Sequence, residues 1–346
     1  MHGGDIYNNR VVLDHSVNLN PYFDTGDGAD PARLYPDTDQ SELRKIIASS
    51  ENVEPENVFS GCGASELLMA AAYAFKPKCA LFIEPCFTGY RHVVGALGDC
   101  VIKRYYLRDE DGFALTEGFA GALSSDVDMI FIADPNNPTG RNIDNALLII
   151  IFDRARELGI TVLLDESFYP LSRGYDSRRS AGFIREYENL VIIRSYTKTF
   201  ALPGIRMGCV VSSSENIEKI RAHLPEWNLP AHTEEVMKEC VGKWNKEIYE
   251  GSMRLIETER VFLSDELSRL GFTVYPSDTA FILFKGPEGL YEKLLEQGVL
   301  IRNCDDYDGL GSGYYRIAVR RHDENVRLAD AIRSIVPGGV ETGFER

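Results

Sequence analysis

The stretch Leu190–Lys198, with the sequence LVIIRSYTK, joins an apolar segment to a polar turn that ends on a lysine. Four consecutive apolar residues before a turn are typical of a buried strand in an α/β protein. An arginine follows between two glycines in Gly204–Gly208, GIRMG. Hydroxyls at Ser195 and Thr197, together with the guanidinium of Arg206, can hold a dianionic phosphate through charge-assisted hydrogen bonds. The spacing therefore predicts a reactive amine beside a phosphate cradle, and the ordinary alternative is a solvated surface lysine.

Polar groups follow two further predicted strands. Asn137 lies in the turn Asp134–Gly140, DPNNPTG, after the apolar segment Met129–Ala133. Asp165 ends the buried-strand pattern Thr161–Leu164. Because an α/β sheet presents ligand groups at the carboxyl ends of its strands, both side chains are expected at that edge. Taken singly, the first segment is an ordinary turn and the second an ordinary helix N-cap.

A glycine-rich turn, Gly61–Glu66 with the sequence GCGASE, precedes a predicted helix at Leu67–Phe75. The free N–H groups and the positive dipole end of such a helix can bind a phosphate. The lysine, the arginine, the Asn turn, the strand-end Asp and these glycines together form the set that pyridoxal 5′-phosphate requires. On these motifs the chain resembles the class I and II aminotransferases of fold type I, in the branch of histidinol-phosphate aminotransferase and threonine-phosphate decarboxylase. The resemblance extends from His2-Gly3-Gly4 to about Ile335.

The resemblance implies an α/β fold, with a large domain that binds pyridoxal phosphate around a mostly parallel sheet and a smaller α+β domain. Short apolar strands such as Ala80–Ile83 alternate with amphipathic helices such as Asn145–Leu158, which agrees with that sheet. We place the large domain at residues 38–230. The small domain takes residues 1–37, as an N-terminal arm, and residues 231–346, which begin with a linking helix.

Patterns after Pro230 describe the small domain further. A long helical pattern covers roughly residues 234–270. Strands are expected at Val299–Arg302 and Tyr314–Val319, and a last helix near Glu324–Ile335.

The resemblance implies a role for each matched residue. Lys198 is the Schiff-base lysine and Asp165 the carboxylate on the pyridinium nitrogen, and these are the expected catalytic residues. Asn137 is the partner of the ring's 3′ oxygen, while Phe87 stacks on the ring or, alternatively, is plain core. Tyr35 reaches the phosphate of the neighbouring subunit, which implies a homodimer. The expected cofactor ligands are Tyr35, Ala64, Ser65, Phe87, Asn137, Asp165, Ser195, Thr197, Lys198 and Arg206.

The substrate side rests on arginines. Arg316 matches the arginine that grips the substrate α-carboxylate in a fork, and Arg302 is expected to meet a substrate phosphate. Surface ion pairing is the ordinary alternative for such residues. Phe168 replaces the family's usual tyrosine, so the 3′ oxygen loses a donor, and His15 replaces a common phenylalanine. The expected substrate-binding residues are Arg316, Arg302, Asn20 and His2.

Composition limits the partners. The 346 residues carry 53 acidic and 37 basic side chains, a net charge of −16, which argues against nucleic acid or an anionic membrane surface. The seven cysteines show neither CxxC pairs nor histidines at zinc spacing, so we predict no metal site and no disulfide frame. The longest apolar run, residues 146–152, is too short to span a bilayer. We expect a cytoplasmic protein with a small-molecule substrate.

The reaction depends on which bond to the substrate Cα lies perpendicular to the cofactor ring. Gly63–Leu67, Ala201–Gly204 and Phe168 are spelled more like threonine-phosphate decarboxylase, so decarboxylation of a phosphorylated amino acid, with L-threonine-O-3-phosphate favoured, is the first hypothesis. The alternative is an aminotransferase that uses histidinol phosphate or another amino acid with 2-oxoglutarate. A non-catalytic pyridoxal-binding protein is a third class. A Rossmann dehydrogenase is excluded, since no strand precedes GxGxxG with its acidic partner.

Overall fold

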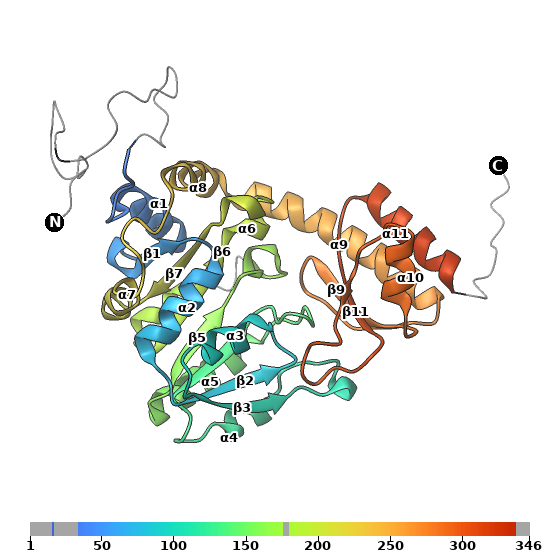
Figure 1. Cartoon of the computed structure of the whole chain (residues 1–346), viewed down its shortest axis with the longest axis horizontal. Coiled ribbons are helices and arrows are strands. Elements are labelled where there is room, and N and C mark those ends of the chain that lie inside the picture. The colour runs from blue at the N-terminus through green and yellow to red at the C-terminus, as the bar shows by residue number, and fades with distance from the viewer. Residues whose placement is uncertain (1–15, 17–33, 176–179, 337–346) are drawn as a thin grey trace, which may run out of the picture.

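The computed structural model describes Ser16, residues 34–175 and residues 180–336 (Figure 1). In these residues, seven strands form a large sheet in the order β1-β7-β6-β5-β4-β2-β3. The neighbours from β6 to β3 are parallel, whereas β7 is antiparallel to both β6 and β1. The expected mostly parallel sheet is therefore confirmed. Its strands are β1 (Val58–Gly61), β2 (Cys79–Glu84), β3 (Val101–Tyr106), β4 (Met129–Ala133), β5 (Thr161–Asp165), β6 (Leu190–Ser195) and β7 (Gly208–Ser212).

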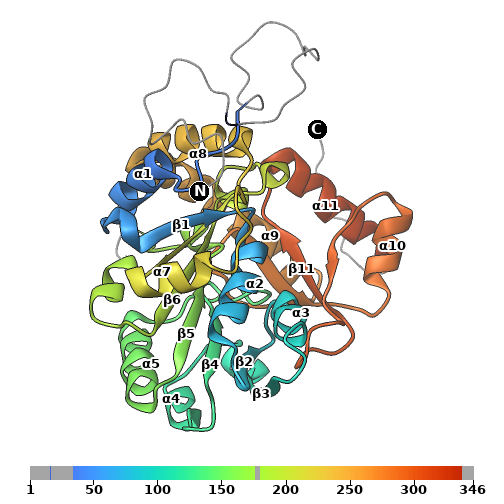
Figure 2. The same cartoon turned by 60° about the vertical axis from the view of Figure 1, so that its left-hand side comes forward.

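Helices cover the large sheet, and successive strand residues point into two different cores. Phe82 and Phe131 lie in the core with residues of α2, α3 and α7, whereas Leu81 and Ile132 lie in the core with residues of α1, α5 and α8. Burial on both sides explains the nearly continuous apolar strands. Figures 1 and 2 show α2 in front of the strands. These helices are α1 (Ser41–Glu51), α2 (Ala64–Phe75), α3 (Gly89–Gly95), α4 (Gly118–Ala122), α5 (Asn145–Leu158), α6 (Tyr196–Thr199), α7 (Ser214–Arg221) and α8 (Ala231–Lys243).

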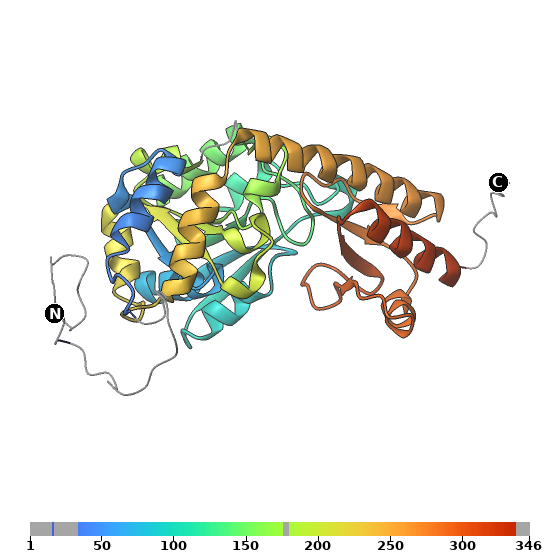
Figure 3. The ribbon, with the colours of Figure 1, turned by 90° about the horizontal axis from the view of Figure 1, so that it is seen from above.

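A second, antiparallel sheet forms the small domain in the order β10-β11-β9-β8. The long helix α9 runs from the large sheet toward it (Figure 3). Helices α9, α10 and α11 pack against the small sheet around their own core. No helix in the described part of the chain is long and apolar enough to cross a membrane. The elements are α9 (Lys246–Arg269), β8 (Thr273–Val274), β9 (Phe281–Lys285), α10 (Leu290–Glu296), β10 (Arg302–Asn303), β11 (Tyr314–Ala318) and α11 (His322–Ile335).

Two predicted elements are corrected by the structure. The helical pattern over residues 234–270 is broken into α8 and α9. Asn245 has extended backbone angles, and its side chain accepts a hydrogen bond from the Ile248 amide at 3.0 Å, so it caps a new helix. The strand predicted from Val299 is shorter, because the Val299 amide bonds to the Leu294 carbonyl at 2.9 Å and closes α10 instead.

The two domains share part of a core. Phenol hydroxyls of Tyr275 and Tyr314, from the small domain, donate to the two carboxylate oxygens of Asp109 in the large domain, at 2.6 and 2.8 Å. The domain bounds at residues 37/38 and 230/231 stay a prediction. Small-domain residues that join the core of the large domain are Tyr275, Leu283, Cys304, Tyr307 and Tyr314.

Candidate active site

The sequence-predicted groups lie at the carboxyl ends of neighbouring parallel strands. Asp165 ends β5 and pairs across the sheet with Ala133 of β4 and Ile193 of β6. Asn137 lies in the turn that follows β4, and Lys198 follows β6 in the one-turn helix α6. The structure thus brings the carboxylate, the amide and the amine to one edge of the sheet, where doubly wound folds bind their ligands.

A second group of residues lies where β6, β7 and β1 adjoin. Ser195 pairs with Gly208, and Gly208 pairs with Gly61. A Cβ at Gly208 would lie only 3.0 Å from the backbone nitrogen of Ala64. Glycine here therefore lets the first turn of α2 come close to the sheet, beside Ser195.

Arg206 approaches the same helix start. A Cβ at Gly63 would lie 2.6 Å from the Arg206 Nη2, and Gly63 has a φ of +81°. The Arg206 Nη1 donates to the Pro203 carbonyl at 3.1 Å, which fixes the side chain. Exposed Ser65 stands in the first turn of α2, whose N–H groups have no partner within the helix. A guanidinium beside a helix N-terminus makes a site for an anion.

The amine of Lys198 contacts a hydroxyl of the predicted phosphate cradle. Its Nζ donates to the Ser195 Oγ at 3.3 Å, and that oxygen is 2.9 Å from the Thr197 Oγ1. The Nζ also lies 5.5 Å from the centre of the Phe168 ring. The side chain is exposed to solvent, yet desolvation by the surrounding protein lowers the pKa of its ammonium group, against the pull of Asp165 and with help from Arg206 and Arg316. A lowered pKa favours the neutral, nucleophilic amine.

Asp165 is buried and held by two donors. Its Oδ2 accepts from the Tyr90 hydroxyl at 2.8 Å, and its Oδ1 accepts from the Ser167 amide at 2.9 Å. Burial, followed by the charge of Asp165, raises the pKa of Tyr90 well above its usual value, so the phenol stays a donor. The Phe87 ring meets Tyr90 edge-on at 5.6 Å, and a Cβ at Gly89 would strike Phe87 at 2.3 Å. Phe87 is half-buried and packs against the core that contains Tyr90, so its stacking on the cofactor ring stays a prediction.

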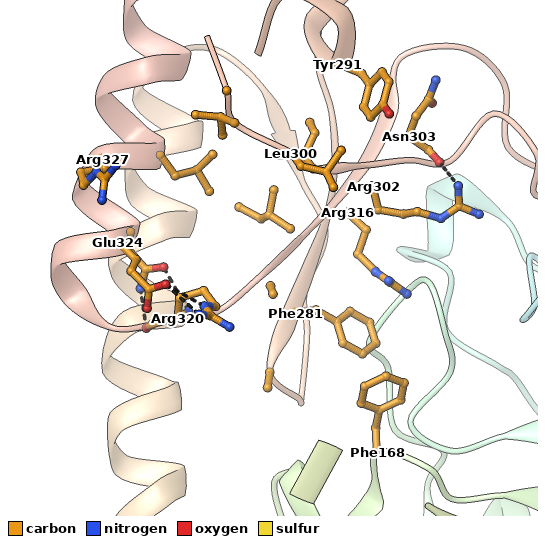
Figure 4. Close-up of a pocket in the computed structure, with 18 residues that line it drawn as sticks. Phe168, Phe281, Tyr291, Leu300, Arg302, Asn303, Arg316, Arg320, Glu324 and Arg327 are labelled. Carbon is orange, nitrogen blue, oxygen red and sulfur yellow. Dashed lines mark hydrogen bonds and ion pairs between the residues drawn. The ribbon is translucent and has the colours of Figure 1, made fainter. Parts of the chain in front are cut away.

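Asn137 is contacted from the small domain. Its Oδ1 accepts from the Arg316 Nη1 and, at 3.4 Å, from the Tyr307 hydroxyl. The Arg316 guanidinium lies over the Phe281 ring at 5.1 Å, and Phe281 meets Phe168 edge-on at 4.9 Å. Figure 4 shows Arg316, Phe281 and Phe168 in succession. Arg316 therefore reaches the Asn137 side chain, and within the described residues it forms no ion pair; its role toward a substrate stays a prediction.

Arg302 lies beside Arg316. The two residues are paired across β10 and β11, and both line a cavity of about 930 Å³. In Figure 4 their guanidinium groups point the same way, toward loops of the large domain. The Arg302 Nη2 donates to both carboxylate oxygens of Asp306, at 2.8 and 2.7 Å. A phosphate at Arg302 would therefore have to compete with that carboxylate.

The remaining predicted residues lie apart or outside the described chain. Tyr35 is exposed, and its ring packs on Trp227 at 4.7 Å. His2, His15 and Asn20 fall outside the described residues.

Sequence reasoning gave no role to two residues of this site. Tyr90 follows β2 closely, so its place after a buried strand was an available signal. Tyr307 lies in a loop of the small domain, and nothing in its local sequence relates it to Asn137.

Similar proteins indicate the family to which this chain belongs. Residues 27–332 match the family model described as aminotransferase class I and II. The chain belongs to this family. The threonine-phosphate decarboxylase of Salmonella typhimurium is 31% identical over 360 residues, covering 97% of each chain. The histidinol-phosphate aminotransferase 2 of Archaeoglobus fulgidus is 31% identical over 346 residues, covering 94% of each. The crystal structure of the histidinol-phosphate aminotransferase from Clostridium acetobutylicum superposes with a TM-score of 0.79 at 26% identity, covering 88% of this chain and 91% of that one.

Class I and II aminotransferases depend on pyridoxal phosphate, and the residues present fit that group. A phosphate needs a positive, hydrogen-bonding cradle, which the start of α2 and Arg206 provide; the side chain of an alanine at position 63 would occupy part of that space. A protonated pyridine nitrogen needs a buried carboxylate, and Asp165 is 6% exposed. An aldehyde needs an amine with a lowered pKa, which is Lys198. All three lie at one sheet edge.

Proposed function

We propose that this enzyme is a pyridoxal-phosphate-dependent lyase that decarboxylates a phosphorylated amino acid, with L-threonine-O-3-phosphate favoured. The observation that carries the proposal is the pairing of Arg302 with Arg316 across β10 and β11, on the wall of one cavity. Two adjacent guanidinium groups suit a substrate with two anionic groups, a carboxylate and a phosphate. The similarity to a threonine-phosphate decarboxylase over 97% of both chains supports it.

The negative net charge of the chain makes Arg302 and Arg316 important for binding an anionic substrate. The chain carries a net charge of −16, so its distant field repels an anionic substrate. That field is screened within about 10 Å at ordinary ionic strength, whereas forked contacts act at short range. Binding must therefore come from short-range contacts such as those that Arg302 and Arg316 can make.

The cofactor, when bound, supplies a ring that accepts the electrons of a bond broken at the substrate Cα. The residues around it then have separate tasks. Asp165, held by Tyr90 and the Ser167 amide, keeps a positive charge on the ring nitrogen. Lys198 holds or gives up a proton at its Nζ, and the lowered pKa of its ammonium group favours release of that proton. Arg316 fixes the carboxylate.

Transamination is the second candidate. A dicarboxylate such as 2-oxoglutarate also offers two anionic groups to Arg302 and Arg316, and relatives of similar identity are named histidinol-phosphate aminotransferases. The two reactions share every residue discussed, so a product assay must separate them.

The deciding experiment supplies the enzyme, loaded with pyridoxal phosphate, with L-threonine phosphate in one mixture. A second mixture contains histidinol phosphate and 2-oxoglutarate. We expect CO₂ from the first and little glutamate from the second. Glutamate from the second without CO₂ from the first would establish the aminotransferase instead.

A pair of variants tests the phosphate role. Arg302→Ala should lower kcat/KM for threonine phosphate by about 10- to 100-fold and reduce the preference over unphosphorylated threonine, since a charge-assisted contact is lost. Arg320→Ala is the matched control, because Arg320 lines the same cavity and is likewise paired with an acidic residue four positions on, Glu324. Equal preference in both variants would remove Arg302 from this role.

A further inference from the structure

Tyr307 belongs to the small domain by sequence but is buried against the large one. It lies between β10 and β11, is 3% exposed, and packs within the core of the large domain. Its neighbour Asp308 fixes the loop, because it forms ion pairs with Arg104 at 3.0 Å and with Arg91 at 3.2 Å, both on the large domain. Before the tyrosine, the Asp306 carbonyl accepts from the Arg91 Nη2 at 2.9 Å, so the loop is anchored to the large domain on both sides of Tyr307.

The Tyr307 side chain contacts residues of the site on two sides. Its hydroxyl is 3.4 Å from the Asn137 Oδ1, and its ring lies 5.2 Å from the Arg302 guanidinium carbon. Burial, opposed by Arg316, raises the pKa of the phenol, so it donates at neutral pH. One side chain thus adjoins the amide and the arginine that the proposed function uses.

The chemistry of the donors fixes which way the Asn137 amide faces. Arginine has no acceptor, so the atom that meets the Arg316 Nη1 must be the amide oxygen. The Tyr307 hydroxyl adds a second donor to that same oxygen. The amide nitrogen then turns away, and in the described part of the chain it has no hydrogen-bond partner, so it is the group left to donate to a ligand.

We propose that Tyr307 is a positioning residue that, with Arg316, holds the Asn137 amide so that its nitrogen faces the cofactor. The inference rests on the proposed function, in which Arg316 also binds the substrate carboxylate. That function gives Tyr307 no contact with the substrate carboxylate. Tyr307 keeps the amide in place when Arg316 turns toward substrate, and it also connects the small domain to the cofactor site.

The test measures cofactor affinity directly. Tyr307→Phe keeps the ring against Arg302 and removes only the hydroxyl. Titration of the apoenzyme with pyridoxal phosphate, followed by absorbance, should show about 3- to 10-fold weaker binding, the effect of one neutral hydrogen bond. Tyr314→Phe is the matched control, since it removes another interdomain phenol contact, to Asp109, away from Asn137. It should bind like the wild type.

A double-mutant cycle distinguishes positioning from general stability. In an Asn137→Ala background, Tyr307→Phe should weaken binding no further, because its hydroxyl acts through the amide. Thermal unfolding of each variant checks that the chain folds. The same loss with and without Asn137, or a Tyr307→Phe affinity equal to that of the wild type, overturns the inference alone. A wild-type chain that bound no pyridoxal phosphate would overturn the proposed function and the inference with it.

Discussion

Lys198 combines access with a shifted ionisation. It is open to solvent, but the protein around it lowers the pKa of its ammonium group. Borohydride reduction in the presence of pyridoxal phosphate should therefore attach a pyridoxyl group to Lys198, as identified by peptide mass. Lys198→Ala should abolish the label, whereas Lys246→Ala, at an exposed lysine of α9, should leave it intact. A label that persists in Lys198→Ala would assign the aldehyde to another lysine.

Glycine at position 63 permits both a positive φ and the close approach of Arg206. Gly63→Ala places a methyl group 2.6 Å from the Arg206 Nη2, so it should weaken pyridoxal phosphate binding by at least about 10-fold through displacement of a phosphate ligand. Gly98→Ala is the control, since its φ is also positive, +86°, while nothing lies within 4 Å of the added Cβ. Both variants should lose about 1 to 2 kcal/mol of stability from the strained φ. Equal cofactor affinity in the two would exclude the contact as the cause.

The sequence alone could place the residues that follow buried strands. The end of a strand is visible in the local sequence, and the carboxyl ends of parallel strands lie at one edge of the sheet. That reasoning brings together Asp165, Asn137 and Lys198. It could not place Tyr307, whose partner is 170 positions away, since such pairings arise only from the packing of two domains. For Arg302, ion pairing was left open as an alternative, but the sequence could not say which carboxylate it would bond, because sequence gives proximity and not side-chain direction.

At the scale of elements, the ends of β5 and β6 carry a second polar group beside the site. Glu166 and Arg194 form a fully buried ion pair, and Arg194 also bonds Glu51 at 3.0 Å. Two carboxylates thus share one guanidinium. Burial raises the pKa of Glu166 to about 7, and Ser180 donates to it at 2.5 Å. These residues follow or precede Asp165 and Ser195 by one position, so they brace the same strand ends.

The raised pKa of Glu166 makes the free energy of unfolding depend on pH. Between about pH 4.3, where a free glutamate titrates, and about pH 7, the unfolded chain has released a proton that folded Glu166 still holds. The contribution of Glu166 to the free energy of unfolding therefore falls as pH rises through that window. The free energy of unfolding of wild type and of Glu166→Gln can be measured with denaturant at pH 5 and at pH 7.5. Relative to Glu166→Gln, the wild type should be less stable at pH 7.5 than at pH 5. A constant difference would contradict the shifted pKa.

The hydrophobic pattern predicted the bounds of strands that are buried on both faces of the sheet, as in β4 and β5. They failed where a polar residue ended a helix that the pattern continued, as Asn245 does between α8 and α9. Edge strand β3 was not predicted, because a lysine and an arginine interrupt its apolar residues and its side chains are exposed or half-buried. Patterns record burial, so an element that buries little leaves little trace.

At the scale of the molecule, we propose a homodimer with shared sites. The basis is Tyr35, an exposed tyrosine that the family resemblance assigns to the neighbouring subunit's phosphate. Mixing inactive Lys198→Ala and Tyr35→Ala chains should restore about a quarter of wild-type activity, since half the dimers are mixed and one site in each has both residues. Light scattering should give twice the monomer mass. A monomer, or no recovered activity after subunit exchange, would exclude shared sites.

The shared core between the domains has a consequence for how the chain is made. Cys304, Tyr307 and Tyr314 pack into the same core as Leu43 and Ile47, although they are encoded near opposite ends. A ribosome releases the N-terminal part first, so a nascent large domain waits with apolar surface uncovered until almost the whole chain has emerged. Chains that terminate before Cys304 should therefore be recognised by chaperones and proteases rather than persist as a separate folded domain.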